Sequence, residues 1–277
     1  MTNFRDWLKN TQARRAGIPR LRTMRGLPDV LTLGDLSVVY QPIVSLTTME
    51  PFAHEALVRS NSPHWINPPK LFDEAIQSRC VGALGRAIRE LSTTHCPGMP
   101  LFLNVHPNEF DESWLVQPDD PIFTHDSTVY LEVTESVPLT HFAYCHSVLR
   151  EIRGKGVLLA VDDLGAGYSN LKYIADLKPE MVKLDRTLIA DLADDRRAQV
   201  LVRHIVQLCH ELGARVVAEG IEQETEMQVV IDCGADYGQG YYFAYPACPA
   251  PGVSEAPIEV MRESEIGARL KTGPTGS

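Results

Sequence analysis

The chain has 277 residues, of which 44% are hydrophobic and 22% are charged, a composition typical of globular proteins at a length that suits one large domain or two small ones. It contains no apolar run near 18 residues, and its N-terminus lacks the apolar core of a secretory signal, so we expect no transmembrane span and a cytoplasmic location. The net charge of -10 argues against general nucleic-acid binding by the body of the protein.

The first 28 residues differ from the rest because they are basic, with seven lysines and arginines against one aspartate. Phe4, Trp7 and Leu8 have the spacing of a short amphipathic helix, which Gly17 and Pro19 would end. Such an arm is compatible with a solvated extension, and also with contact to a membrane surface, a nucleic acid or an acidic protein partner. We therefore treat residues 1–28 as an extension outside the folded domain.

From about Leu36 onward, short apolar runs alternate with stretches of helical period. Repeated strand and helix units of this kind predict a parallel α/β sheet. Eight strands in this length favour a closed (β/α)8 barrel of the TIM type over an open doubly wound sheet, which is the alternative. We assign residues 29–249 to the barrel and 250–277 to a tail with a short helical pattern. The predicted strands are 36–43, 52–58, 100–105, 128–134, 157–162, 181–185, 214–220 and 237–243, and the predicted helices are 69–77, 81–93, 142–153, 196–212 and 224–233.

Polar side chains accompany nearly every predicted strand, close to the point where the chain turns into a loop. An unpaired ion in a buried strand costs several kcal/mol, and the C-terminal ends of barrel strands carry the chemistry in this architecture. One shared site therefore explains the pattern better than separate accidents. The residues concerned are Glu55, Asn104, Glu132, Glu135, Asp162, Asp163, Lys183, Glu219, Glu222 and Gln239.

Carboxylate and amide oxygens in this number favour a hard cation such as Mg²⁺ or Mn²⁺. Asp163 directly follows Asp162 and is expected to point elsewhere, so the pair can serve two ions with one aspartate bridging. Two ions about 4 Å apart form a clamp for phosphoryl chemistry. Lys183 could orient the attacking water, accept its proton or offset negative charge, and the sequence does not separate these roles.

Other site types are less well supported. The segment LGAGYSN follows a predicted strand, but Asn170 stands where a dinucleotide fingerprint needs its third glycine. The histidines show no metal-ligand spacing. The cysteines are scattered without a C-x-x-C pair, which predicts free thiols and no structural zinc. They are Cys80, Cys96, Cys145, Cys209, Cys233 and Cys248.

The string EALVR, which begins at Glu55 and follows YQPIV by about fifteen residues, resembles the EAL-domain family of cyclic di-GMP phosphodiesterases. The segments LNVHP, LEVTE, VDDLGAGYSNL, VKLD, VAEGIE and GQGYYF follow in the family's order. The similarity runs from about residue 30 to residue 248. It implies a barrel whose first strand is antiparallel to the others, a homodimer, and hydrolysis of cyclic di-GMP to linear pGpG.

The resemblance also implies roles for individual residues. Lys183 matches a lysine beside the catalytic water, Gln239 and Glu222 match residues that support the water and metal network, and Glu135 matches the anchor of the loop after Asp163. The implied substrate contacts are Gln41, Pro42 and Arg59. The implied ligands are Glu55, Asn104, Glu132 and Asp162 for the first metal, and Asp162, Asp163 and Glu219 for the second.

Four positions depart from the family pattern. Leu164, Ala166 and Asn170 replace the usual Phe, Thr and Ser, and His106 replaces a Ser. No presumed metal ligand is missing, which favours an active phosphodiesterase. A non-catalytic cyclic di-GMP receptor that acts through protein contacts is the alternative, followed by an interaction module that binds no nucleotide. We expect these four departures to affect loop dynamics, dimer coupling and substrate affinity rather than the hydrolytic chemistry.

Overall fold

The computed structural model describes residues 36–61, 67–134, 142–166, 171–248 and 250. The predicted N-terminal arm, nearly all of the C-terminal tail, Glu135 and Asn170 lie outside these ranges. No helix within the described ranges has the length and apolar character needed to cross a membrane.

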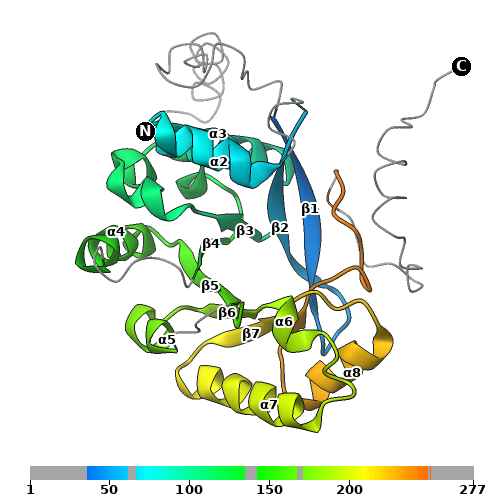
Figure 1. Cartoon of the computed structure of the whole chain (residues 1–277). Helices are drawn as coiled ribbons and strands as arrows, with labels where there is room; N and C mark the ends of the chain where they lie inside the picture. The colour runs from blue at the N-terminus through cyan, green and yellow to red at the C-terminus, as the bar shows by residue number, and fades with distance from the viewer. Residues whose placement is uncertain (1–35, 62–66, 135–141, 167–170, 249, 251–277) are drawn as a thin grey trace, which may run out of the picture.

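Eight strands close into a barrel in sequence order, and Figure 1 labels β1 to β7. The first strand, β1, runs antiparallel to β2 and also to β8, whereas every other neighbouring pair is parallel. The predicted (β/α)8 barrel with one antiparallel strand is therefore confirmed. The strands are β1 (Leu36–Ser45), β2 (Pro51–Ser60), β3 (Leu101–Asn104), β4 (Val129–Thr134), β5 (Leu158–Leu164), β6 (Met181–Leu184), β7 (Arg215–Ala218) and β8 (Tyr237–Gly238).

The five predicted helices are present with ends within two residues of those expected. They are α2 (Pro68–Gln77), α3 (Val81–His95), α4 (Phe142–Gly154), α7 (Arg196–Glu211) and α8 (Glu224–Asp232). Two short helices and three 3-10 helices were not predicted, because segments of three to six residues are too short to show a helical period. These are α5 (Lys172–Leu177), α6 (Arg186–Ile189), η3 (Pro107–Asp111), η4 (Ser113–Val116) and η5 (Pro121–Phe123).

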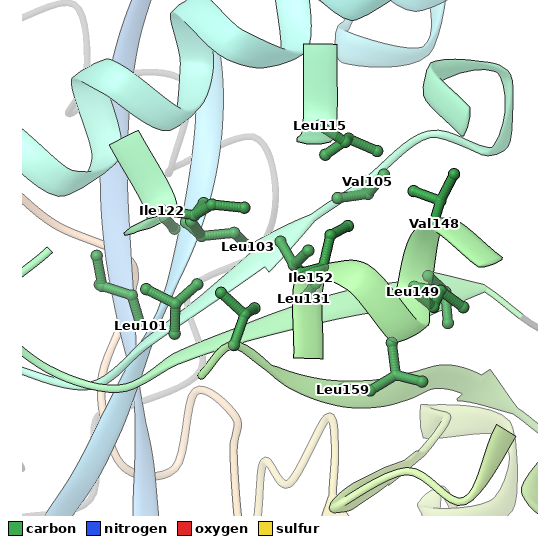
Figure 2. Close-up of a cluster of buried hydrophobic side chains, with 14 of the residues drawn as sticks. Leu101, Leu103, Val105, Leu115, Ile122, Leu131, Val148, Leu149, Ile152 and Leu159 are labelled. Carbon is green, nitrogen blue, oxygen red and sulfur yellow. The ribbon is translucent and has the colours of Figure 1, made fainter. Parts of the chain in front are cut away.

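Apolar side chains pack the space between the strands and the surrounding helices. One cluster joins β3, β4 and β5 to α4 and the 3-10 helices, as Figure 2 shows for Leu103, Leu131 and Ile152. A second cluster joins β6 and β7 to α7 and α8. These two clusters hold the barrel wall rigid from outside, so that the inward-facing side chains are fixed in place.

A third apolar cluster plugs the interior of the barrel with one residue from each strand. Its members are Ile43, Ala53, Phe102, Tyr130, Ala160, Met181, Val217 and Tyr237. Alternate residues of a strand share a face, so the residue two positions further toward the open end of the barrel also points inward. Because β1 runs in the opposite direction, its inward partner precedes Ile43 rather than following it. This layering places a second ring of side chains directly above the apolar plug.

Candidate metal centre

The second inward ring is polar at every strand. Moving two residues from each plug residue reaches Gln41, Glu55, Asn104, Glu132, Asp162, Lys183, Glu219 and Gln239. All eight were predicted from the sequence as site residues. The alternation of apolar and polar inward positions explains why the apolar runs carry polar residues near one end.

Lys183 lies at the centre of this ring. Its Nζ is 2.6 Å from Glu132 Oε1, 3.2 Å from Asp162 Oδ1 and 3.3 Å from Glu55 Oε2. It is also 2.5 Å from Glu219 Oε1, and only 1% of the lysine side chain is exposed. Four carboxylates from four strands therefore converge on one ammonium group.

The electrostatics of the ring follow from burial and from this crowding. Burial alone would lower the pKa of Lys183, but the surrounding carboxylates outweigh it and hold the pKa well above its ordinary value. Burial, together with repulsion by Glu55, holds the pKa of Glu132 well above its ordinary range. Burial and neighbouring carboxylates raise the pKa of Glu219 to about 8, against the pull of Lys183. The ring thus contains more negative charge than its own lysine can neutralise.

Glu55 is the best-supported carboxylate of the ring. Asn104 Nδ2 donates to its Oε1 at 3.0 Å, and Gln239 Nε2 donates to its Oε2 at 2.7 Å. Although burial opposes ionisation, Lys183 and these hydrogen bonds lower the pKa of Glu55. Gln41 extends the network, because its Oε1 accepts from Gln239 at 3.2 Å and its Nε2 donates to Ala244 O at 3.2 Å.

The expectation that Asp163 points away from Asp162 is wrong. Asp163 has a left-handed backbone with φ of 59°, and the pairing of β5 with β6 shifts register between Val161 and Leu164. This irregularity brings the ligand atoms of Asp162, Asp163 and Glu219 to within 4.8 Å of one another. Burial and the repulsion of Asp162 raise the pKa of Asp163 to about 6.

The donor set fits a divalent cation. Glu132 Oε2 is buried and finds no hydrogen-bond donor among the described residues, although a buried carboxylate oxygen is costly without a partner. Three further carboxylates gather within reach of a single ion. Oxygen ligands in this number suit Mg²⁺ or Mn²⁺ rather than a metal that prefers nitrogen or sulfur.

The predicted substrate contacts and supporting residues do not all line the same cavity, unlike the residues of the polar ring that meet at Lys183. A cavity of about 310 Å³ above the ring is lined by Gln41 and Glu222, but the Glu222 carboxylate forms an ion pair with Arg186 rather than with Lys183. Arg59 lines a neighbouring cavity of about 490 Å³. Pro42 lies between two inward-facing residues of β1 and lines neither cavity.

Sequence reasoning missed three polar residues that line the first cavity, namely Asp185, Arg186 and Tyr241. Asp185 and Tyr241 lie inside the motifs VKLD and GQGYYF, and Arg186 directly follows VKLD. Their place in or beside these motifs was the available signal. Of the departures from the family pattern, His106 stacks on Phe72 with ring centroids 5.7 Å apart. Leu164 is buried, and the Ala166 N–H donates to Asp163 O at 3.1 Å.

The described cysteines Cys80, Cys96, Cys209, Cys233 and Cys248 are free thiols, as predicted. Burial raises the pKa of Cys209 to about 12 and that of Cys80 to about 11. The thiols of Cys209 and Cys80 are therefore unreactive at neutral pH, and none of the described cysteines belongs to the polar ring.

Comparisons with known proteins agree with this geometry. Residues 24–246 match the family model of the EAL domain. The chain is 34% identical over 225 residues to the cyclic di-GMP phosphodiesterase PA2567 of Pseudomonas aeruginosa, which covers 76% of this chain and 38% of the relative. It spans 31–38% of the length of three curated relatives that it matches.

Two solved structures of BlrP1 from Klebsiella pneumoniae are also similar. The complex with calcium and cyclic di-GMP has a TM-score of 0.69 at 26% identity, covering 91% of this chain and 68% of that one. The complex with manganese and cyclic di-GMP has a TM-score of 0.68 at 25% identity, covering 90% of this chain and 68% of that one.

Proposed function

Because the chain belongs to the EAL domain family, we propose that it hydrolyses one phosphodiester of cyclic di-GMP and releases linear pGpG. One observation carries the proposal. Every presumed metal ligand is present, and four of their carboxylates converge on Lys183 beside a cavity, with Asp163 close to two of them. A relative and two solved structures that act on or bind cyclic di-GMP support this choice of substrate.

The proposal includes two divalent ions, Mg²⁺ or Mn²⁺. Glu55, Asn104, Glu132 and Asp162 would hold the first ion, and Asp162, Asp163 and Glu219 the second. When bound, such a pair supplies an activated water and charge stabilisation for in-line displacement at phosphorus. The short reach from Asp162 to both Asp163 and Glu219 supports a bridging role for Asp162.

The chain's own residues contribute positioning and charge. Gln239 and Asn104 donate to the two oxygens of Glu55 and so fix the direction of that carboxylate. The ammonium of Lys183 keeps its proton in this carboxylate environment, which suits it to donate to the attacking water or to a phosphate oxygen rather than to act as a base. The apolar plug below the ring closes the barrel to water from the opposite end.

A turnover assay on cyclic di-GMP with Mg²⁺, Mn²⁺ and Ca²⁺, with chromatography for pGpG, tests the proposal. We expect pGpG with Mg²⁺ and Mn²⁺, and inhibition by Ca²⁺ because its looser coordination supports the geometry poorly. Binding without pGpG in every metal would favour the receptor alternative instead. Absence of nucleotide binding in calorimetry, with and without metal, would leave the interaction module.

The homodimer and the role of the basic arm are further proposals. Light scattering of the full chain tests the first, with a mass of twice 30.8 kDa expected. Deletion of residues 1–28 tests the second, because we expect it to weaken recruitment to a protein partner or an anionic membrane without changing turnover. Unchanged recruitment would count against a role for the arm.

A further inference from the structure

The cavity above the polar ring has an uneven distribution of charge. Two cations line it, Lys183 and Arg186. Lys183 is buried and paired with four carboxylates, whereas half of the Arg186 side chain is exposed. Among the residues that line this cavity, Arg186 therefore carries the accessible positive charge. The acidic residues of the lining are Glu55, Asp162, Asp163, Asp185, Glu219 and Glu222.

The stem of Arg186 is held in a defined path. Arg186 is the first residue of α6, directly after Asp185, whose side chain accepts from the Thr187 N–H and caps the helix. The stem crosses Gly220, where an added Cβ would lie 2.6 Å from both Cβ and Cγ of Arg186. Gly220 also has a φ of 68°, so glycine is required there both for the backbone and for the passage of this arginine.

The present partner of the guanidinium is the Glu222 carboxylate at the rim of the cavity. The backbone of Glu222 is held in place, because its N–H donates to Glu226 Oε2 at 2.7 Å. Because half of the Arg186 side chain is exposed, this ion pair adds little net stability, and the guanidinium can exchange Glu222 for another anion at small cost. Arginine is also suited to phosphate, because its planar donors bind two oxygens at once.

The charge balance of the proposed loaded site identifies that anion. Two divalent ions and Lys183 would supply five positive charges, which match the five carboxylates of the proposed ligand set. The substrate would add two phosphodiester charges, of which the proposed ions would neutralise only that of the cleaved phosphate. The second phosphate needs another cation, and Arg186 reaches outward to the rim rather than inward to Lys183.

We infer that Arg186 is a substrate-contact residue, whose guanidinium exchanges Glu222 for the phosphodiester that is not cleaved. This inference rests on the proposed function, since it assumes a cyclic dinucleotide over the polar ring. Arg59 lines the adjacent cavity and would therefore approach the substrate from a different side. The two arginines are therefore not interchangeable.

Calorimetry of cyclic di-GMP in Ca²⁺, with the linear dinucleotide GpG as a one-phosphate control ligand, tests the inference. For Arg186→Gln we expect the Kd of cyclic di-GMP to rise about tenfold, as for the loss of a charged hydrogen bond. The Kd of GpG should change by less than about twofold, because the missing phosphate is the one that Arg186 contacts. In Mg²⁺, KM should rise while kcat stays within about twofold.

Two further variants separate a substrate contact from a structural role. Arg186→Lys keeps the charge and should recover part of the affinity. Arg215→Gln is the matched control, because Arg215 is a partly exposed arginine paired with Asp236 at the opposite end of the barrel, and it should bind like the wild type. Equal weakening of cyclic di-GMP and GpG in Arg186→Gln, or no weakening, would overturn the inference. A wild-type protein that neither binds nor hydrolyses cyclic di-GMP would instead overturn the proposed function as well.

Discussion

Lys183 Nζ lies 2.6 Å from Glu132 Oε1, and the two side chains are 1% and 0% exposed. A buried ion pair of this kind tolerates the loss of one partner poorly, because the other charge is left without compensation. The pair therefore links the stability of the barrel to the chemistry proposed for it. The same lysine neutralises part of the carboxylate ring when the chain folds.

Removal of this lysine should abolish turnover and also weaken the metal-free fold. We expect Lys183→Ala to show no pGpG formation and to lose about 3 kcal/mol of unfolding free energy in EDTA, since carboxylates remain buried. Urea unfolding and the chromatographic assay measure the two effects. Lys178→Ala, at the exposed end of α5, is the control and should behave like the wild type. Full turnover in Lys183→Ala would sink the catalytic assignment.

Glu55→Ala should likewise abolish turnover, but for a different reason. Its carboxylate accepts from Asn104 and Gln239, so its loss removes a ligand and releases the two amides that orient it. Circular dichroism should show an intact fold, because the apolar plug below is unchanged. Measurable pGpG from this variant would contradict the proposed ligand set.

The left-handed backbone at Asp163 allows its charge and its conformation to be tested separately. Asp163→Asn should weaken Mn²⁺ binding about tenfold or more, with little change in unfolding free energy, because asparagine tolerates a φ of 59°. Asp163→Val should lower the unfolding free energy by a further amount of about 1–3 kcal/mol, since a β-branched residue is strained at this φ. Calorimetry with Mn²⁺ and urea unfolding measure these effects. Equal stability of the two variants would show that the backbone at this position relaxes.

Metal affinity should rise with pH between about 6 and 8. The pKa of Glu219 is raised to about 8 and that of Asp163 to about 6, so protons occupy these ligands at low pH and compete with the ion. We expect Mn²⁺ to bind at least about tenfold more tightly at pH 8 than at pH 6. Glu219→Gln should bind more weakly and lose most of this dependence. If the Mn²⁺ affinity of Glu219→Gln depended on pH as steeply as that of the wild type, the effect would belong to another group.

The same raised pKa values should make the metal-free fold less stable as the pH rises. A carboxyl group whose folded pKa is raised stabilises the fold while it keeps its proton, and this contribution is lost as pH rises through the folded pKa. In EDTA, the unfolding free energy should therefore fall between about pH 5 and pH 8. A titration of urea midpoints measures it, and a rise over this range would contradict the assignment.

A second buried ion cluster predicts a purely structural effect. Arg89 donates to Glu109 at 2.6 Å and to Asp120 at 2.8 Å, and all three side chains are at most 1% exposed. Arg89→Ala should lower the unfolding free energy by about 3–5 kcal/mol, because two buried carboxylates lose their partner. Arg86→Ala is the matched control on the same helix, since its pair with Asp119 is more exposed and should contribute less than about 1 kcal/mol. Thermal unfolding compares them directly.

The fold could be predicted well from local sequence. The strands are mainly apolar runs and each long helix shows its period, so element type and order follow from burial and periodicity. The polar residues of the ring were recognisable for the same reason, because an ion inside an apolar strand requires a partner. The short helices α5 and α6 escaped prediction because their stability comes from packing rather than from their own sequence.

What the sequence by itself determined is therefore the barrel, its antiparallel first strand by resemblance, and the identity of the ring residues. Only the tertiary structure decided where their atoms meet. The turn of Asp163 back toward Asp162 depends on a register shift between β5 and β6, which strand alternation cannot reveal. The pairing of Arg186 with Glu222 joins residues 36 positions apart. Contacts of this kind arise from the pairing of strands and the closure of the barrel, which bring strand ends that are distant in the sequence to one site.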